Sequence, residues 1–383
     1  MNQKELNEIR RRFKPDRTAI SKVYGCYVSS ARQIISYIDA PMGLMSQEEQ
    51  EMFLNLLKKS LSGALGRNLI DIVFSTAQVA DSDEHRLLQT LRQTALQDPN
   101  AREMLYRRII DSIDMGDSSY LILLAADAYD VPRRGSDDQV LADGSDTVFK
   151  YFVCSICPVK DPTLALRYSD ELSEFHSCST GHIASPPELG FLFPAFDGRA
   201  ANLYNALFYS KKADQIHQEF IDAVFHTEPP MSAAEQKEAF QSALRDGLGD
   251  ACTVEVVQVI HERLLDRMAR HKESKDPEPL EVTAQDVAAI LRDCGVGEEP
   301  IAAFQDQCRE LLGEGVLNPA NLIDPRRFEF KTEAAAVTVD PERSYLVELR
   351  EIDGRKYLLV PADAGVEING FALSGAGLGS AEC

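Results

Sequence analysis

Apolar residues recur at helical spacing near the start of the chain and then give way to strand-like runs. Residues 4–13 predict a short helix that ends before Pro15, because proline does not continue a helix. Two β-rich runs around Ser29-Ser30 predict a hairpin. Ser46 and Glu49 form a capping-box pattern that predicts the start of a second helix. The apolar side chains of this helix are expected to be buried: Phe53, Leu56, Leu57 and Leu61.

From Tyr120 the sequence is rich in β-branched and aromatic residues. Four apolar runs predict the strands of one sheet that is buried on at least one face: YLILLAADAYDVP, TVFKYFVCSICPV, GFLFPAFDGR and NLYNALFYSKK. Asp197-Gly198 falls between the last two runs and is typical of a hairpin turn. The intervening patterns predict a strand at 68–75, helices near 82–96 and 100–114, and a polar surface loop at 133–146.

A helical segment and a second β-rich segment complete the pattern. Residues 213–312 have helical spacing, with capping patterns at Ser232 and Thr283. Asp353-Gly354, between alternating apolar residues, predicts a further hairpin. The fold class is therefore α+β, with a largely antiparallel sheet in the N-terminal region. The expected division is an α+β domain at 1–226, an acidic helical region at 227–320, a small β module at 321–373 and a flexible tail at 374–383.

Charge narrows the classes of partner. The chain has 383 residues and a formal net charge of -21, which repels nucleic-acid phosphates unless a local basic patch overrides it. Residues 4–22 are such a patch, with seven basic and three acidic residues, although a solvated helix face is the simpler interpretation. Neither a secretory signal nor an apolar run of membrane-spanning length is recognised, so the eight cysteines are expected to be reduced thiols in the cytoplasm.

Cysteines and histidines between residues 154 and 182 are the candidate metal ligands. Cys154, Cys157, His176, Cys178 and His182 together would offer zinc a sufficient set of ligands. A redox pair is a second interpretation of the first two cysteines, but it requires a helix to start there. We favour a third, buried thiols in a strand, because side chains three positions apart in a strand point to opposite faces. No metal site is therefore assigned.

Other candidate residues stand alone in the sequence. Asp127 and Asp130 end a predicted strand, where catalytic carboxylates and turn-capping ones both occur. Arg199 follows the Asp197-Gly198 turn and is a candidate anion ligand, although an exposed turn arginine is the simpler interpretation. Phosphate-binding loops, dinucleotide fingerprints and hydrolase elbows are not recognised. Four histidines are expected on exposed helix faces: His217, His226, His261 and His271.

Segments spread over most of the chain resemble a bacterial family of unknown function, the domain-of-unknown-function family numbered four-three-one-seven. They include KELNEIRRRF, YGCYV, LSGALGRNLID, CSICPVK, ALFYSKK, MSAAEQKEAF, KESKDPEPL, RRFEFKT and VELREIDGRKYLLVPADAGVEING. The resemblance runs from residue 2 to about residue 373 and implies a cytosolic bacterial protein without an assigned activity. It supplies no catalytic residue, and HSCSTGH and the tail 374–383 depart from its pattern. The order of elements is also similar to that of nucleoid-associated proteins of the 37-kilodalton class.

The sequence favours a non-enzymatic cytosolic binding or regulatory protein. No catalytic residue and no cofactor are predicted, and a protein is the favoured partner, with a homo-oligomer as a further option. A nucleoid-associated protein is the alternative, although the acidic charge disfavours nucleic acid, and no membrane partner is expected. A metal-dependent enzyme that uses the cysteines and histidines between residues 154 and 182 is the third hypothesis.

Overall fold

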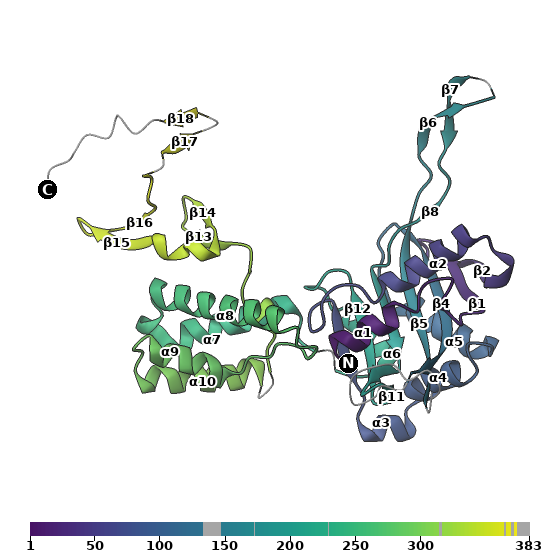
Figure 1. Ribbon diagram of the computed structural model, residues 1–383, viewed down its shortest axis with the longest axis horizontal. Helices are drawn as coiled ribbons and strands as arrows, with labels where there is room; N and C mark the ends of the chain where they lie inside the picture. Colours follow the sequence, from purple (N-terminus) through teal and green to yellow (C-terminus); the bar gives the residue numbers. More distant parts are fainter. Residues whose placement is uncertain are drawn as a thin grey trace. The chain divides into compact units, whose positions relative to one another are not determined.

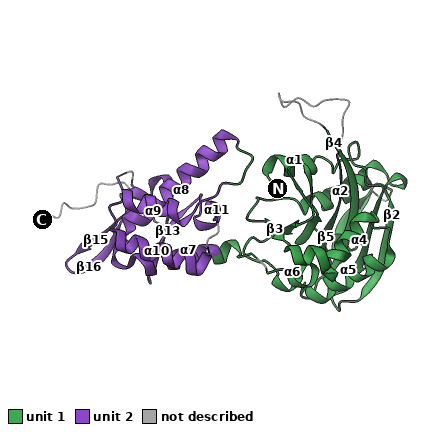
Figure 2. Cartoon of the chain, turned by 90° about the horizontal axis from the view of Figure 1, so that it is seen from below, with its two compact units in different colours: residues 1–235, 276–279 green, residues 236–275, 280–383 purple. Residues whose placement is uncertain are grey.

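The computed structural model describes residues 1–132, 147–171, 173–228, 230–313, 316–363, 365–368 and 371–373 (Figure 1). The chain divides into two compact units (Figure 2): unit 1 comprises residues 1–235 and 276–279, and unit 2 comprises residues 236–275 and 280–383. The predicted α+β class is confirmed. The predicted loop 133–146 and tail 374–383 lie outside the described residues.

Unit 1 is built on one eight-stranded sheet, and every strand pairing described in it is antiparallel. The strand order is β2-β1-β4-β5-β9-β12-β3, with β8 added to β5. The predicted hairpin around Ser29-Ser30 is confirmed as β1 and β2. The strands are β1 Lys22–Val28, β2 Ile34–Pro41, β3 Leu69–Val73, β4 Ser119–Val131, β5 Thr147–Lys160, β8 Ile183–Ala184, β9 Leu189–Phe193 and β12 Asn205–Ser210.

Helices cover both faces of this sheet, so both faces are buried. One core includes side chains of α4, α5 and α6, and the other includes side chains of α1 and α2. The predicted Ser46–Glu49 capping box of α2 is confirmed. Two of the four side chains expected inside are buried, Leu57 and Leu61. The helices are α1 Gln3–Arg10, α2 Gln47–Lys59, α3 Thr76–Asp81, α4 Asp83–Gln93, α5 Pro99–Ser112 and α6 Gln218–Phe225, and η1 Met42–Leu44 is a 3₁₀ turn.

Two short hairpins extend unit 1 beyond the main sheet. The turn predicted at Asp197-Gly198 is confirmed and joins β10 (Ala195–Asp197) to β11 (Ala200–Asn202). Both Gly198 and Arg199 have left-handed backbone there, with φ of 56° and 59°. The second hairpin, β6 (Leu164–Ser169) with β7 (Glu174–Ser179), was not predicted, because its apolar side chains stay exposed instead of facing a core.

Unit 2 is a helical core followed by three hairpins. The capping boxes predicted at Ser232 and Thr283 are confirmed. The Asp353-Gly354 hairpin is also confirmed, with φ of 51° and 73° at the two turn residues. The helices of unit 2 are α7 Ala233–Leu248, whose first three residues are counted with unit 1, α8 Val254–Ser274, α9 Ala284–Asp293, α10 Glu298–Leu312 and α11 Pro319–Leu322, with 3₁₀ turns η2 Gly249–Ala251 and η3 Pro341–Leu346. The hairpins are β13 Phe328–Lys331 with β14 Ala336–Val339, β15 Glu348–Ile352 with β16 Arg355–Leu359, and β17 Val366–Ile368 with β18 Phe371–Leu373.

None of the helices in the described ranges is both long enough and apolar enough to cross a membrane.

Candidate functional site

A buried ion pair ties the segment after α1 to the main sheet. Asp127 near the end of β4 is 4% exposed and accepts two hydrogen bonds from Arg12, from Nε at 3.0 Å and from Nη2 at 3.1 Å. The Tyr151 hydroxyl on β5 donates to the same carboxylate at 2.9 Å, and so does the backbone N–H of Ala19. The planar arginine fork matches a carboxylate in two places, so this contact fixes the position of the Arg12 guanidinium.

The contacts of Asp127 argue against a catalytic role for it. Four donors occupy the acceptor positions of a single carboxylate, so no position is left to take a proton from a substrate. Burial raises the pKa of Tyr151 well above its usual value, and the nearby Asp127 charge raises it further, so the phenol stays neutral and donating. Asp130, the other candidate on this strand, is exposed.

Arg199 is held by a second set of carboxylates, those of α1. Its Nη1 donates to Glu8 Oε2 at 2.6 Å, and its Nη2 donates to the carbonyl of Pro132 at 2.8 Å. Tyr129 donates to the other Glu8 oxygen at 2.6 Å, and burial, followed by this hydrogen bond, raises the pKa of the phenol. The Arg12 guanidinium lies over the Tyr129 ring, 5.0 Å from its centroid. Arg12 and Arg199 are therefore both anchored beside Tyr129.

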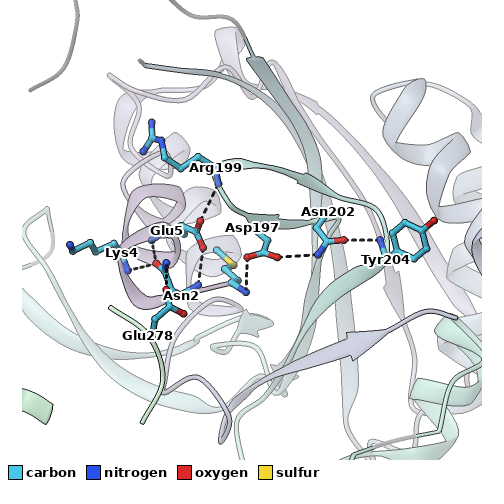
Figure 3. A network of polar contacts seen from close by, with 9 residues as sticks. Asn2, Lys4, Glu5, Asp197, Arg199, Asn202, Tyr204 and Glu278 are labelled. Carbon is cyan, nitrogen blue, oxygen red and sulfur yellow. Dashed lines mark hydrogen bonds and ion pairs between the residues drawn. The ribbon is translucent and has the colours of Figure 1, made fainter. Parts of the chain in front are cut away.

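The start of α1 fixes the backbone from which Arg199 extends. Asn2 and Glu5 cap the helix reciprocally, and Glu5 Oε1 also accepts the backbone N–H of Arg199 at 3.1 Å. Figure 3 shows this network, with Glu5 between the helix start and the β10–β11 turn. Asn2 also donates to Glu278, which belongs to unit 1 although it is far along the chain. The left-handed turn at Arg199 is thus held by a carboxylate from the first turn of α1.

Four arginines line one hollow in unit 1, of about 470 Å³, and the contacts above position two of them, Arg12 and Arg199. We call it the arginine pocket; its lining residues are Glu8, Arg11, Arg12, Asp16, Arg17, Tyr129, Pro132 and Arg199. Asp127 neutralises Arg12 and Glu8 neutralises Arg199. Arg17 lies 3.7 Å from Asp16 with both side chains exposed, and Arg11 makes no ion pair within the described part of the chain. The lining groups and Asp127 thus sum to +4 - 3 = +1.

Arg199 was the one residue of this pocket named from the sequence as an anion ligand. The structure places three more arginines beside it, all from the basic segment 4–22. The net positive charge of residues 4–22 was the feature of the sequence that could have indicated these three arginines. The sequence could not show that this distant turn would meet the segment, since the hydrogen bond from the Arg199 N–H to Glu5 joins positions 194 apart.

The five metal-ligand candidates do not form one group. The prediction that Cys154 and Cys157 are strand residues facing apart is confirmed, because Cys154 belongs to one core of unit 1 and Cys157 to the other. Burial raises the pKa of Cys157 to about 12. His176 and Cys178 lie on β7, and His182 Nδ1 lies 3.4 Å from the hydroxyl of Tyr27. Within the described ranges, no three His, Cys, Asp or Glu side chains are grouped to hold a metal ion.

Two of the four histidine predictions are wrong: His217 is not on a helix face, because it precedes α6 and is half-buried, and His261 is buried. His261 on α8 was expected on an exposed helix face, but it is only 7% exposed. Its Nε2 lies 3.1 Å from the Asp324 carbonyl oxygen, and its ring meets Phe328 edge-on at 4.9 Å. The helical spacing placed it beside Ile260 and Leu264 at the border of the buried face, where sequence alone does not separate a buried position from an exposed one.

The fold and the pocket together define a two-unit α+β protein with an arginine-lined hollow in its N-terminal unit. The chain belongs to the family described as domain of unknown function DUF4317, whose model matches residues 1–371. The family resemblance found in the sequence is therefore confirmed. Comparison with curated proteins finds no match.

Proposed function

We propose that this chain is a cytoplasmic binding protein whose unit 1 takes up a ligand through an anionic group, a phosphate or a carboxylate, in the arginine pocket. The observation that carries the proposal is the gathering of four arginines around one hollow of about 470 Å³ in a chain with a net charge of -21. Arginine presents paired donors that match the oxygens of both anions.

The four arginines divide into two anchored ones and two available ones. Arg12 and Arg199 are held by carboxylates and so define the shape of the pocket. Arg11 and Arg17 are exposed, and the 3.7 Å Arg17–Asp16 contact is of the kind that contributes little in water. An incoming anion can therefore recruit Arg11 and Arg17 without breaking a buried ion pair.

A binding role is favoured over a catalytic one because the strand-end carboxylate of Asp127 already accepts four hydrogen bonds. The nucleoid-associated alternative loses support from other contacts of the basic segment 4–22. Arg10 donates to the carbonyls of Leu61 and Gly63, and Lys22 pairs with Asp39 at 2.5 Å, so much of the basic segment already has a partner. Binding along a nucleic acid needs several free cations in a row.

The proposed cytoplasmic location is supported by the cysteines. All seven described cysteines are free thiols. Free thiols in this number are typical of proteins in a reducing compartment.

Isothermal titration of the full chain with inorganic phosphate, and separately with acetate, tests the proposal at low ionic strength. We expect saturable binding of at least one anion, weakening as salt is added. Replacing both Arg11 and Arg17 by Gln should weaken it about tenfold or more, since a hydrogen bond to a charged group contributes about 1.5–3 kcal/mol. Lys14→Gln is a control for charge loss in the same segment, because it removes one positive charge outside the pocket, where the double variant removes two inside it.

Two results would refute the proposal. One is the absence of saturable binding for both anions. The other is equal binding by the arginine double variant and the Lys14→Gln control. A nucleic-acid role would instead appear as tight, salt-sensitive binding of duplex DNA that Lys14→Gln and the double variant weaken alike.

A further inference from the structure

Unit 2 contains a cavity that the arginine pocket does not explain. Its volume is about 220 Å³, and it lies where α7 and α8 meet the segment that leads from α11 to β13. Just over half of its wall is apolar, and this part comes from Phe240, Leu244, Val257, Ile260, Leu322, Ile323 and Phe328. Small-molecule sites typically combine apolar side chains with polar groups that fix the orientation of the ligand.

The size of the cavity limits the ligand to a small one. An apolar cavity of roughly 150 Å³ is enough to hold benzene. A volume of about 220 Å³ therefore admits one six-membered ring, or a branched aliphatic group, with a short chain attached.

His261 contributes an uncharged surface to this wall. A carbonyl oxygen only accepts, so Nε2, at 3.1 Å from the Asp324 carbonyl, carries the proton and donates it. Nδ1 has no hydrogen-bond partner in the described structure and is buried. Burial lowers the pKa of His261, and the charge of Lys237 lowers it further, against an opposing effect of Asp324. The ring is therefore neutral and packs edge-on against Phe328.

The charged side chains of the wall balance, two positive and two negative, but one of the positive ones makes no ion pair with a described residue. Asp324 accepts from Arg327 Nε at 2.9 Å, and Glu329 pairs with Lys331 at 3.0 Å. Lys237 is exposed and makes no ion pair with any residue in the described ranges. A ligand with its apolar end among the wall side chains can place a negative group beside this ammonium.

We propose that the unit 2 cavity binds a small carboxylate with an apolar body, of about the size of a phenyl ring on a short chain, with its carboxylate beside Lys237. This site lies in a different unit from the arginine pocket and selects a different chemistry, because it combines seven apolar side chains with one cation that makes no ion pair with a described residue. The two proposals can therefore fail independently.

The experiment uses the full chain with ¹³C-labelled isoleucine, leucine and valine methyl groups. Methyl spectra are recorded during titration with 4-phenylbutyrate and, separately, with the neutral 4-phenylbutanol. We expect saturable shifts at Ile260 and Ile323, which line the cavity, and tighter binding of the carboxylate than of the alcohol. Lys237→Gln should remove that preference, lowering affinity for the carboxylate about two- to fivefold, as an exposed ion pair does.

Two further variants make the outcome decisive. Val257→Phe places a larger side chain at a half-buried wall position and should abolish the shifts, while methyl signals remote from the cavity show that the variant is folded. Lys272→Gln, which removes a charge from the end of α8 away from the cavity, should bind like the unmodified chain. The proposal is overturned if neither probe gives saturable shifts, if Val257→Phe leaves them unchanged, or if Lys237→Gln and Lys272→Gln bind the carboxylate alike.

Discussion

Replacing Asp127 by Asn should strongly destabilise unit 1. The amide keeps one acceptor oxygen but places an NH₂ group where the other oxygen accepts two hydrogen bonds. Whichever way the amide is turned, Arg12 loses one partner and the charge that balances it. Removing one partner of a buried ion pair costs about 3–5 kcal/mol. The Arg12 side chain is 18% exposed, so water reaches part of it and the lower end, about 3 kcal/mol, is expected.

Two comparison variants separate the unpaired charge from a general loss of packing. Tyr151→Phe removes one donor and leaves the ion pair intact, so it should cost less, about 1.5–3 kcal/mol. The triple variant Arg12→Met, Asp127→Leu, Tyr151→Phe removes every buried polar partner at once. It should recover most of the stability, because replacing a whole buried ionic group by apolar residues is often neutral or stabilising. Ala19 is exposed, so water can satisfy the N–H that it leaves behind.

Urea unfolding measures these differences. The chain contains 12 Tyr and no Trp, so tyrosine fluorescence and far-ultraviolet circular dichroism are the signals. With a urea dependence of about 1–3 kcal/mol per molar, a loss of 3 kcal/mol moves the midpoint by about 1–3 M. Because the chain has two units, amide hydrogen exchange of peptides from β4 and β5 assigns the change to unit 1. The reasoning fails if Asp127→Asn costs less than about 1 kcal/mol, or if the triple variant is as unstable as the single one.

Three further predictions concern burial. When the folded protein is labelled with a thiol reagent at pH 8, the half-buried Cys178 should react well before the fully buried Cys154, because burial raises the pKa of the Cys154 thiol. Equal rates of labelling would contradict the assignment of Cys154 to a buried strand. Gly247→Ala should destabilise unit 2 by about 1–3 kcal/mol, because the added methyl group would lie 2.5 Å from the Phe304 Cα on α10. Urea unfolding measures the loss, and an unchanged unfolding midpoint would show that α7 and α10 can move apart at this position. Burial lowers the pKa of His261, so the unfolded chain binds a proton that the folded chain does not, and the free energy of unfolding of unit 2 should fall as pH decreases below about 6.5. His261→Gln should weaken this dependence of stability on pH. An unchanged dependence would mean that other groups cause it.

Local patterns in the sequence were sufficient for most of the secondary structure, though not for the exposed β6–β7 hairpin, and for the opposite orientation of Cys154 and Cys157. The capping boxes at Ser46 and Thr283 and the turn at Asp353-Gly354 depend on residues a few positions apart, so their geometry is already present in the sequence. Alternation along β5 likewise separates Cys154 from Cys157, whatever packs against the strand.

Both candidate sites depended on contacts between residues far apart in the chain. The ion pair between Arg12 and Asp127 joins residues 115 positions apart, and the anchoring of Arg199 on Glu8 joins residues 191 apart. The charge pattern does not indicate which arginine pairs with which carboxylate. Every arginine of the basic segment 4–22 could pair equally well with many of the carboxylates in the chain.

The sequence determined the α+β class, the positions of most helices and hairpins, and an acidic chain with one basic segment at its start. Tertiary structure alone decided that Arg199 joins this segment around one hollow and that His261 is buried beside an apolar cavity. The physical reason is that propensity and periodicity act over a few residues. A pocket instead depends on how separate helices and strands pack, and packing sets the burial and the partner of each side chain.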